Sequence, residues 1–180
     1  MDLLDYYANL KRLDTPIFMR AGIRAVPKGR PRLGRRGFVY TPQSTVDFET
    51  QIRVLGSSIM GHRLPYSCPV IVTVRIFEPV PVSYSKLKKE LAEAGLIVPP
   101  RGDLDNRVKA VTDALNGITY QDDDQVADII ASKRYGAAYL IHITIERVGL
   151  SDLEIDRYKK MKIAQVNNEH STGGRRPRVG

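Results

Sequence analysis

The chain has 180 residues, a formal net charge of +8 and a pI of about 9.7. This length suits one domain with appendages, and the excess of positive charge favours nucleic acid or another anionic surface as the partner. We expect a cytoplasmic protein with no membrane contact, because the sequence has no long apolar run, no recognisable signal peptide and a single cysteine, Cys68, which excludes an internal disulfide.

The first forty residues combine a predicted helix and strand with a strongly basic segment. Residues 2–13 have the pattern of a short amphipathic helix, and residues 17–26 alternate as a first strand. Between Arg20 and Arg36 there are seven Lys or Arg and no Asp or Glu. The guanidinium fork suits phosphate, so we predict contacts to the DNA backbone, with a solvated basic loop as the alternative. The predicted contact residues are Lys28, Arg30, Arg32, Arg35 and Arg36.

Three further elements are predicted before residue 95. A helix begins with Ser44 or Thr45 as its N-cap and runs to about residue 60, with Glu49 placed to assist the cap. Residues 69–77 alternate strongly and predict a strand. Residues 85–94 predict a short charged helix, after which a loop leads to an acidic run.

The acidic run, residues 103–125, is the most informative part of the chain. Apolar residues recur at helical spacing from residue 104 to 115, which predicts a helix with Asp103 or Asp105 as N-cap and Gly117 as C-terminal cap. Such a helix is about 18 Å long. Six or seven extended residues after it would cover about 20 Å. An extended return antiparallel to the helix would bring Asp123 beside Asp103 and Asp105.

Three carboxylates in one pocket indicate a metal site. At about 5 Å and an effective dielectric near 20, each pair repels by about 3 kcal/mol. Either some of the carboxylates are protonated or a cation lies among them, and hard oxygen ligands select Mg²⁺ or Mn²⁺. Lys109 lies one helical turn beyond Asp105, where it can reach a phosphate, and Asp113 one turn further is expected to pair with it. The alternative is structural: a helix cap at Asp103 and a turn at residues 122–124.

After the acidic run the sequence returns to regular elements. Residues 127–135 and 138–148 predict two strands around a turn at Gly136. Residues 152–166 predict a helix, and the polar and basic residues 167–180 predict a flexible tail.

Three motifs, in order, resemble the RusA family of Holliday junction resolvases from bacteria and their phages. They are Pro27-Lys-Gly-Arg-Pro-Arg32 with Tyr40-Thr-Pro42, then Asp103-Leu-Asp-Asn106 with Lys109 and Asp113-Ala-Leu-Asn-Gly117, and finally Asp122-Asp-Asp-Gln125. The similarity extends from about Ile17 to Val148, and the second block is the most specific. One departure is Arg101-Gly102, where relatives often carry proline or another basic residue, and it leaves the local DNA contacts open.

The resemblance implies a homodimeric endonuclease that cuts four-way DNA junctions with Mg²⁺ or Mn²⁺ and without a small-molecule cofactor. It assigns metal binding and catalysis to Asp103, Asp105 and Asp123, because Gln125 fixes the register of the last motif. Asp122 is a secondary metal candidate. The family lysine that follows the Asp-X-Asp-Asn motif falls on Lys109. Such an enzyme acts on the nucleoid in DNA recombination and repair.

The fold that we expect is α+β, with a mixed sheet of four to five strands packed against helices. The nuclease domain is expected over residues 16–150, between a helical extension (1–15) and a C-terminal helix (151–166) with its tail (167–180). Two other functions stay open: a junction-binding architectural protein without catalysis, and a nuclease for flaps or other branched DNA. A sugar or nucleotide transferase built on Asp-X-Asp is disfavoured by the basic surface and the missing nucleotide loop.

Overall fold

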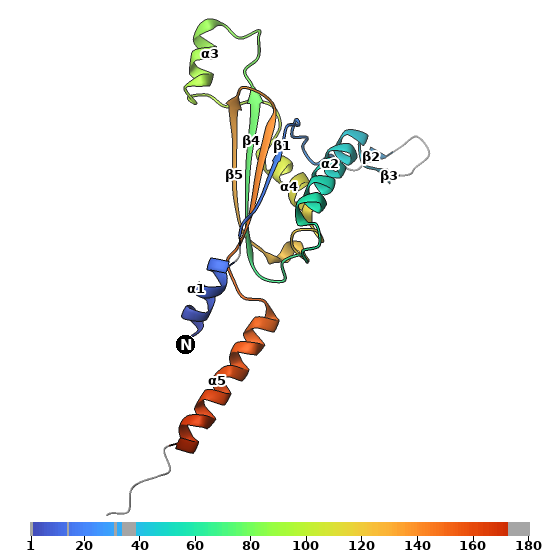
Figure 1. Cartoon of the computed structure of the whole chain (residues 1–180). Helices are drawn as coiled ribbons and strands as arrows, with labels where there is room; N and C mark the ends of the chain where they lie inside the picture. The colour runs from blue at the N-terminus through green and yellow to red at the C-terminus, as the bar shows by residue number, and fades with distance from the viewer. Residues whose placement is uncertain (1, 14, 31, 34–38, 173–180) are drawn as a thin grey trace, which may run out of the picture.

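A computed structural model of the chain describes residues 2–13, 15–30, 32–33 and 39–172 (Figure 1). Its centre is a mixed four-stranded sheet with helices against it, so the predicted α+β class and sheet size are confirmed. In spatial order the strands are β1 (Ile17–Ala21), β6 (Leu140–Arg147), β4 (Val70–Pro79) and β5 (Val126–Gly136).

The strand order separates β5 from β6, although they follow each other in the chain. β4 lies between them, pairs in parallel with β5 and antiparallel with β6, and β6 also pairs antiparallel with β1. The turn near Gly136 therefore joins two strands that are not neighbours. Both strands were predicted, but their partners were not, because pairing between distant strands leaves no local pattern.

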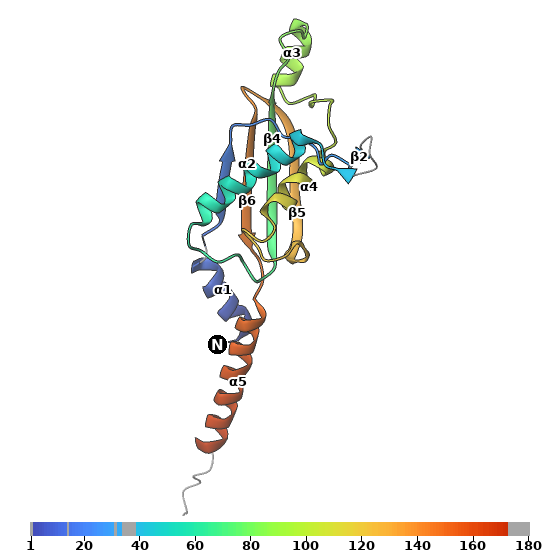
Figure 2. The same cartoon turned by 90° about the vertical axis from the view of Figure 1, so that its right-hand side faces the viewer.

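One face of the sheet is buried beneath two helices, α2 (Gln43–Met60) and α4 (Leu104–Leu115) (Figure 2). Alternate residues of β4, from Val70 to Ile76, point to this face and are almost fully buried, as the alternation predicted. The helices pack on each other, α2 also on β1 and α4 on β5. Each buried Val or Ile contributes about 1.5–3 kcal/mol. The apolar side of α4 is thus fixed on the sheet and its acidic motif faces outward.

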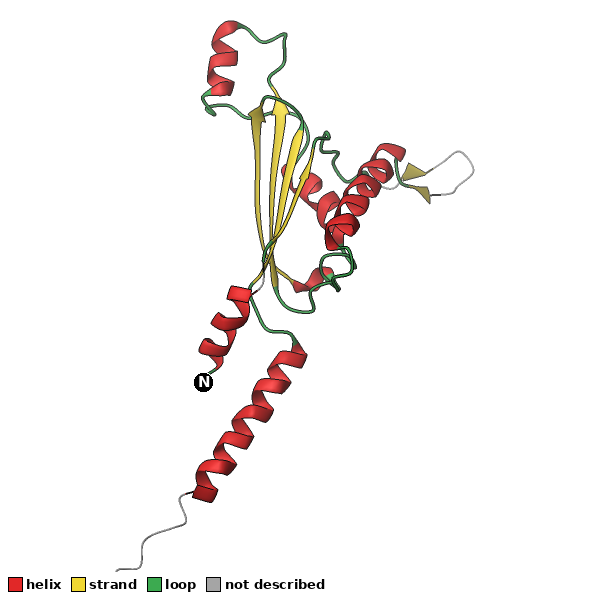
Figure 3. Ribbon diagram, in the orientation of Figure 1, coloured by secondary structure: helices red, strands yellow, loops and turns green. Residues whose placement is uncertain are grey.

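The opposite face of the sheet is covered by no helix of the described part of the chain (Figure 3). One row of paired residues crosses all four strands on this face: Phe18, Thr144, Thr73 and Ile130. Phe18 and Ile130, at its two ends, are 55% and 56% exposed. Large apolar side chains this exposed on a sheet mark a face that another body can cover.

Two predicted boundaries were wrong. β1 ends at Ala21 rather than near residue 26. Helix α2 begins at Gln43 with Pro42 at the N-cap position, and no side chain caps it. Thr45 is buried, and its hydroxyl accepts the backbone N–H of Gly29 at 3.2 Å. Its side chain serves a tertiary contact in place of a cap, and Glu49 likewise pairs with a lysine elsewhere.

Smaller elements surround the sheet. The predicted charged helix is α3 (Lys86–Glu93), and the Ser85 hydroxyl at its N-cap accepts the Lys88 N–H. It lies beyond one end of the sheet (Figure 1). The short strands β2 (Arg32–Leu33) and β3 (Val39–Tyr40) pair antiparallel next to α2.

Helices α1 (Leu3–Leu13) and α5 (Asp152–Thr172) project from the other end of the sheet (Figures 1 and 2). The rings of Tyr6 and Tyr158 bring them together, with centroids 5.8 Å apart. α5 continues past its predicted end at Val166, so the first residues of the predicted tail are helical, and residues 173–180 lie outside the described part. None of the helices in the described ranges has the length and apolar character needed to cross a bilayer.

Candidate active site

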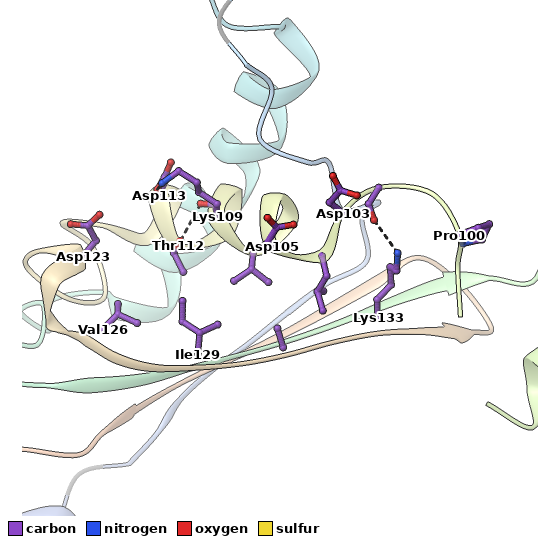
Figure 4. Close-up of a pocket in the computed structure, with 14 residues that line it drawn as sticks. Pro100, Asp103, Asp105, Lys109, Thr112, Asp113, Asp123, Val126, Ile129 and Lys133 are labelled. Atoms are coloured by element: carbon purple, nitrogen blue, oxygen red, sulfur yellow. Dashed lines mark hydrogen bonds and ion pairs between the residues drawn. The ribbon is translucent and has the colours of Figure 1, made fainter. Parts of the chain in front are cut away.

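A cleft of about 910 Å³ lies between α4 and β5 (Figure 4). Its polar wall comes from α4 and the loop after it, and its apolar floor comes from Val126, Ile129 and Ala131 of β5. The charged residues that line it are Asp103, Asp105, Lys109, Asp113, Asp123 and Lys133. All three aspartates predicted to be essential therefore lie in one cleft.

The helix periodicity explains the polar wall. Asp105, Lys109 and Asp113 recur every four residues and form one stripe that lines the cleft, whereas Val108 and Val111 face the core. Asp103 occupies the N-cap position, but its side chain makes no capping hydrogen bond. Its carboxylate therefore does not cap the helix. The structural interpretation of the motif required such a cap.

The second acidic motif folds as a short 3-10 helix, Asp123–Gln125, closed by a capping box. The Asp122 carboxylate accepts the Asp123 N–H at 2.7 Å, and the Gln125 side chain accepts the N–H groups of Gln121 and Asp122. Asp122 and Gln125 thus shape the loop. Asp123 and Asp124 stay exposed, and of these two only Asp123 lines the cleft.

The predicted extended return after α4 was wrong. Gly117 adopts a φ of 73°, and its N–H bonds the Tyr120 carbonyl at 2.9 Å, so the chain turns back within four residues. The buried Tyr120 hydroxyl then donates to the Thr112 carbonyl at 2.8 Å. The acidic loop therefore stays beside the C-terminal half of α4, near Asp113 and not beside Asp103 (Figure 4).

The strand that does run back along α4 is β5. Its first residue, Val126, lines the cleft near Asp123, and Lys133 further along donates to the Gly102 carbonyl at 2.9 Å, next to Asp103 (Figure 4). Lys133 was missed by the sequence analysis. The alternation of the strand could have identified it, because Ile129, Ala131 and Lys133 lie on the same face of β5.

The electrostatics of the cleft show crowded negative charge. A hydrogen bond with the Asp122 carboxyl, partial desolvation and repulsion from Asp122 and Asp113 raise the pKa of Asp123. Burial, followed by the charges of Asp113 and Asp123, raises the pKa of Tyr120. Excess negative charge of this kind is relieved by a bound cation.

The carboxylates suit a divalent ion in their chemistry, but they do not form a complete cage. Among the described residues, no three His, Cys, Asp or Glu side chains form a group that could hold a metal. Mg²⁺ commonly needs only one or two protein carboxylates, since water and substrate phosphate supply its other oxygens. Asp103, Asp105 and Asp123 are exposed along one cleft, so one or two of them can serve as ligands of an ion whose other oxygens come from water and a phosphate.

Lys28, the first of the predicted DNA contacts, is already paired. Lys28 Nζ lies 2.6 Å from Glu49 Oε1 and 2.8 Å from Asp113 Oδ2. Partial burial disfavours its charge, but the two carboxylates outweigh that effect and raise the pKa of Lys28. Arg30 is exposed, Arg32 is described in its backbone, and Arg35 and Arg36 lie outside the described ranges. DNA contacts by these arginines stay a prediction.

A buried arginine anchors the loop in front of the motif. Arg107 on α4 is 2% exposed, pairs with Glu78 of β4 and donates to the Arg101 carbonyl at 2.9 Å. Gly102, with a φ of 76°, lies so close that a Cβ there would be 2.6 Å from the Arg107 guanidinium. This packing sets where the chain enters Asp103.

The model of the endodeoxyribonuclease RusA family matches residues 23–146, which include α2, β4, α4, β5 and the whole cleft. The chain belongs to the RusA endodeoxyribonuclease family. It is also similar to the uncharacterized protein YqaN of Bacillus subtilis (strain 168), with 38% identity over 129 residues, 68% of this chain and 90% of that relative. As a RusA-family member the chain is an endodeoxyribonuclease, and α1 and α5 lie outside the family match.

Proposed function

We propose that this RusA-family endodeoxyribonuclease resolves four-way DNA junctions by paired, symmetric cuts and requires Mg²⁺ or Mn²⁺. The observation that carries the proposal is the cleft between α4 and β5, where three exposed aspartates and Lys109 line a single wall of a protein with a net charge of +8. Acidic side chains gathered on a cationic surface suit phosphodiester hydrolysis, since the ion needs carboxylates and the DNA needs positive charge.

Each residue of the cleft has a distinct role in this proposal. Asp103, Asp105 and Asp123 would supply the metal ligands, one or two to an ion, with Asp122 as a secondary candidate. A bound divalent ion supplies an activated water and neutralises charge on the phosphate. Lys109, whose side chain is 63% exposed at the rim, donates to an oxygen of the scissile phosphate. The apolar floor of the cleft is part of the sheet itself, formed by its edge strand β5.

The DNA arms lie along the basic segment in this proposal. Arg30, Arg32, Arg35 and Arg36 would contact backbone phosphates, which position the junction without reading its sequence. Four such contacts predict that log affinity falls with log salt at a slope of about −4.

We propose a homodimer, because two paired cuts need two clefts related by a twofold axis. The uncovered sheet face supports this arrangement. Phe18 and Ile130 lie in its middle row, Asp128 and Glu146 lie toward one end, and Arg20, Arg75 and Arg134 lie toward the other. Two copies packed face to face with antiparallel strands would place the acidic end of one copy over the basic end of the other.

A synthetic four-way junction, a flap and a plain duplex, each incubated with and without Mg²⁺, test the proposal. We expect symmetric nicks in opposing strands of the junction only, and only with metal. Equal cutting of flaps would indicate a nuclease for branched DNA in general. Tight junction binding without cutting in Mg²⁺ or Mn²⁺ would favour the architectural role.

Two neighbouring aspartates offer a matched pair of variants. Asp123→Asn should reduce cleavage by about 10²-fold or more while junction binding is retained, because the side chain that faces the cleft loses its charge. Asp124→Asn changes the same charge in the same 3-10 turn, outside the cleft, and should cut normally. Asp105→Asn is expected to resemble Asp123→Asn. Equal activity of the two loop variants would remove Asp123 from the site.

A further inference from the structure

Four charged side chains of alternating sign connect helix α2 to the rim of the cleft: Glu49, Lys28, Asp113 and Lys109. Lys28 Nζ lies 2.6 Å from Glu49 Oε1 and 2.8 Å from Asp113 Oδ2. The other oxygen of Asp113, Oδ1, lies 3.9 Å from Lys109 Nζ. Asp113 is therefore shared by two lysines, and it makes the close contact with Lys28.

The backbone holds Lys28 in this place independently of its charge. Its N–H donates to the Asn106 carbonyl of α4 at 2.8 Å, and the next N–H, of Gly29, donates to Thr45 of α2 at 3.2 Å. A Cβ on Gly29 would lie 2.8 Å from Thr45 Oγ1 and 2.9 Å from Pro42. The corner formed by residues 28 and 29 is thus seated between the two helices, and the backbone of Lys28 cannot move outward without breaking these contacts.

The exposure of the two lysines divides their tasks. The Lys28 side chain is 29% exposed and has two carboxylate partners, whereas Lys109 is 63% exposed and, among the described residues, its one ion pair is the long contact with Asp113. A lysine whose ammonium already pairs with two carboxylates has little capacity left to bind a phosphate. A lysine whose nearest carboxylate is neutralised by another cation keeps its ammonium available.

We propose that Lys28 is a positioning residue for DNA cleavage: it neutralises Asp113 and so keeps Lys109 free to bind the scissile phosphate. Lys28 itself makes no phosphate contact in this arrangement, although the basic motif around it predicts one. The inference rests on the proposed nuclease function for its kinetic consequence, but its structural part concerns only the competition of two lysines for one carboxylate.

Removing Lys28 should turn Asp113 towards Lys109. Asp113 is 27% exposed, so a charge left without Lys28 gains by pairing with the remaining cation one helical turn away. Lys28→Met retains the aliphatic part of the side chain. For this variant we expect kcat for junction cleavage to fall about fivefold, the effect of a partly buried ion pair of about 1 kcal/mol, with KM and the salt slope of binding unchanged.

The decisive comparison uses a double variant. Lys28→Met combined with Asp113→Asn removes both the neutralising lysine and the carboxylate that would capture Lys109, so most of the lost rate should return. Lys28→Arg keeps the positive charge and should cut at nearly the wild-type rate. Fold is checked in every variant by thermal unfolding. A double variant as slow as Lys28→Met, or a Lys28→Met protein that loses affinity and salt slope at unchanged kcat, would overturn the proposal.

A readout without catalysis separates this inference from the proposed function. In a crystal structure of Lys28→Met, the distance between Lys109 Nζ and Asp113 should shorten from 3.9 Å to that of a direct ion pair, about 2.8 Å. An unchanged distance refutes the inference whether or not the protein cuts junctions. A wild-type protein that cuts no DNA with Mg²⁺ or Mn²⁺ refutes the nuclease proposal and the kinetic role of Lys28, while the distance still decides the competition for Asp113.

Discussion

The ion pair between Arg107 and Glu78 yields a quantitative prediction, because it is buried and joins α4 to β4. Arg107 is 2% exposed and the Glu78 side chain 13%. Arg107→Met fills similar space but leaves Glu78 without its partner in a nearly dry place. The Arg101 carbonyl, which accepts from Arg107 at 2.9 Å, also loses its donor.

The cost follows from this burial. Breaking a buried pair on one side costs about 3–5 kcal/mol, and the residual exposure of Glu78 argues for the lower end, about 3 kcal/mol. For a chain of this length about 2–4 °C of Tm is lost per kcal/mol, so Tm should fall by about 6–12 °C. The double variant Arg107→Met, Glu78→Met leaves no unpaired charge and should recover all but about 1 kcal/mol, the cost of the unbonded carbonyl.

Urea unfolding of wild type and both variants measures these free energies, and calorimetry gives the shifts in Tm. The Arg107→Met variant should be clearly less stable than the double variant. If both were equally destabilised, the loss would come from the packing of the Arg107 side chain, and the desolvated charge of Glu78 would have no part in it.

Three other predictions concern Arg30, Phe18 and Glu154. Arg30→Ala should weaken binding to all DNA sequences alike and reduce the salt slope by about 1, as measured by fluorescence anisotropy over a salt series; an unchanged slope would leave Arg30 a solvated side chain. Phe18→Glu should produce monomers in analytical ultracentrifugation, whereas Leu64→Glu, at an apolar position 86% exposed in a loop, should not; dimers in both would place the interface elsewhere. Burial opposes the charge of Glu154, but hydrogen bonds from Ser151 and Arg147 outweigh the effect of burial and lower the pKa of Glu154. The stability that the ionised Glu154 contributes is therefore present above the ordinary pKa of a glutamate and is lost as the pH falls through the lowered pKa. Glu154→Gln should therefore be less stable than wild type at pH 7, and the difference in unfolding free energy should shrink as the pH falls below the ordinary pKa of a glutamate; a constant difference would argue against this titration.

The elements whose physics is local could be predicted from the sequence. Alternation predicted β4 because one face of that strand is buried, and the helical spacing of apolar residues predicted α4 for the same reason. The spacing of Asp105, Lys109 and Asp113 also placed them on one stripe, since a turn of helix brings every fourth residue to the same side. Family membership followed from the same motifs.

Which strands and which side chains meet depends on the tertiary packing. β4 separates β5 from β6, and the return along α4 is made by β5 because Gly117 and Tyr120 turn the chain at the end of the helix. Asp123 consequently lies near Asp113. Lys133 occupies the place near Asp103 that was predicted for Asp123. The pairing of Lys28 with Asp113 joins residues far apart in the chain. Such contacts depend on how packed elements lie against one another, and no periodicity within a single segment encodes them.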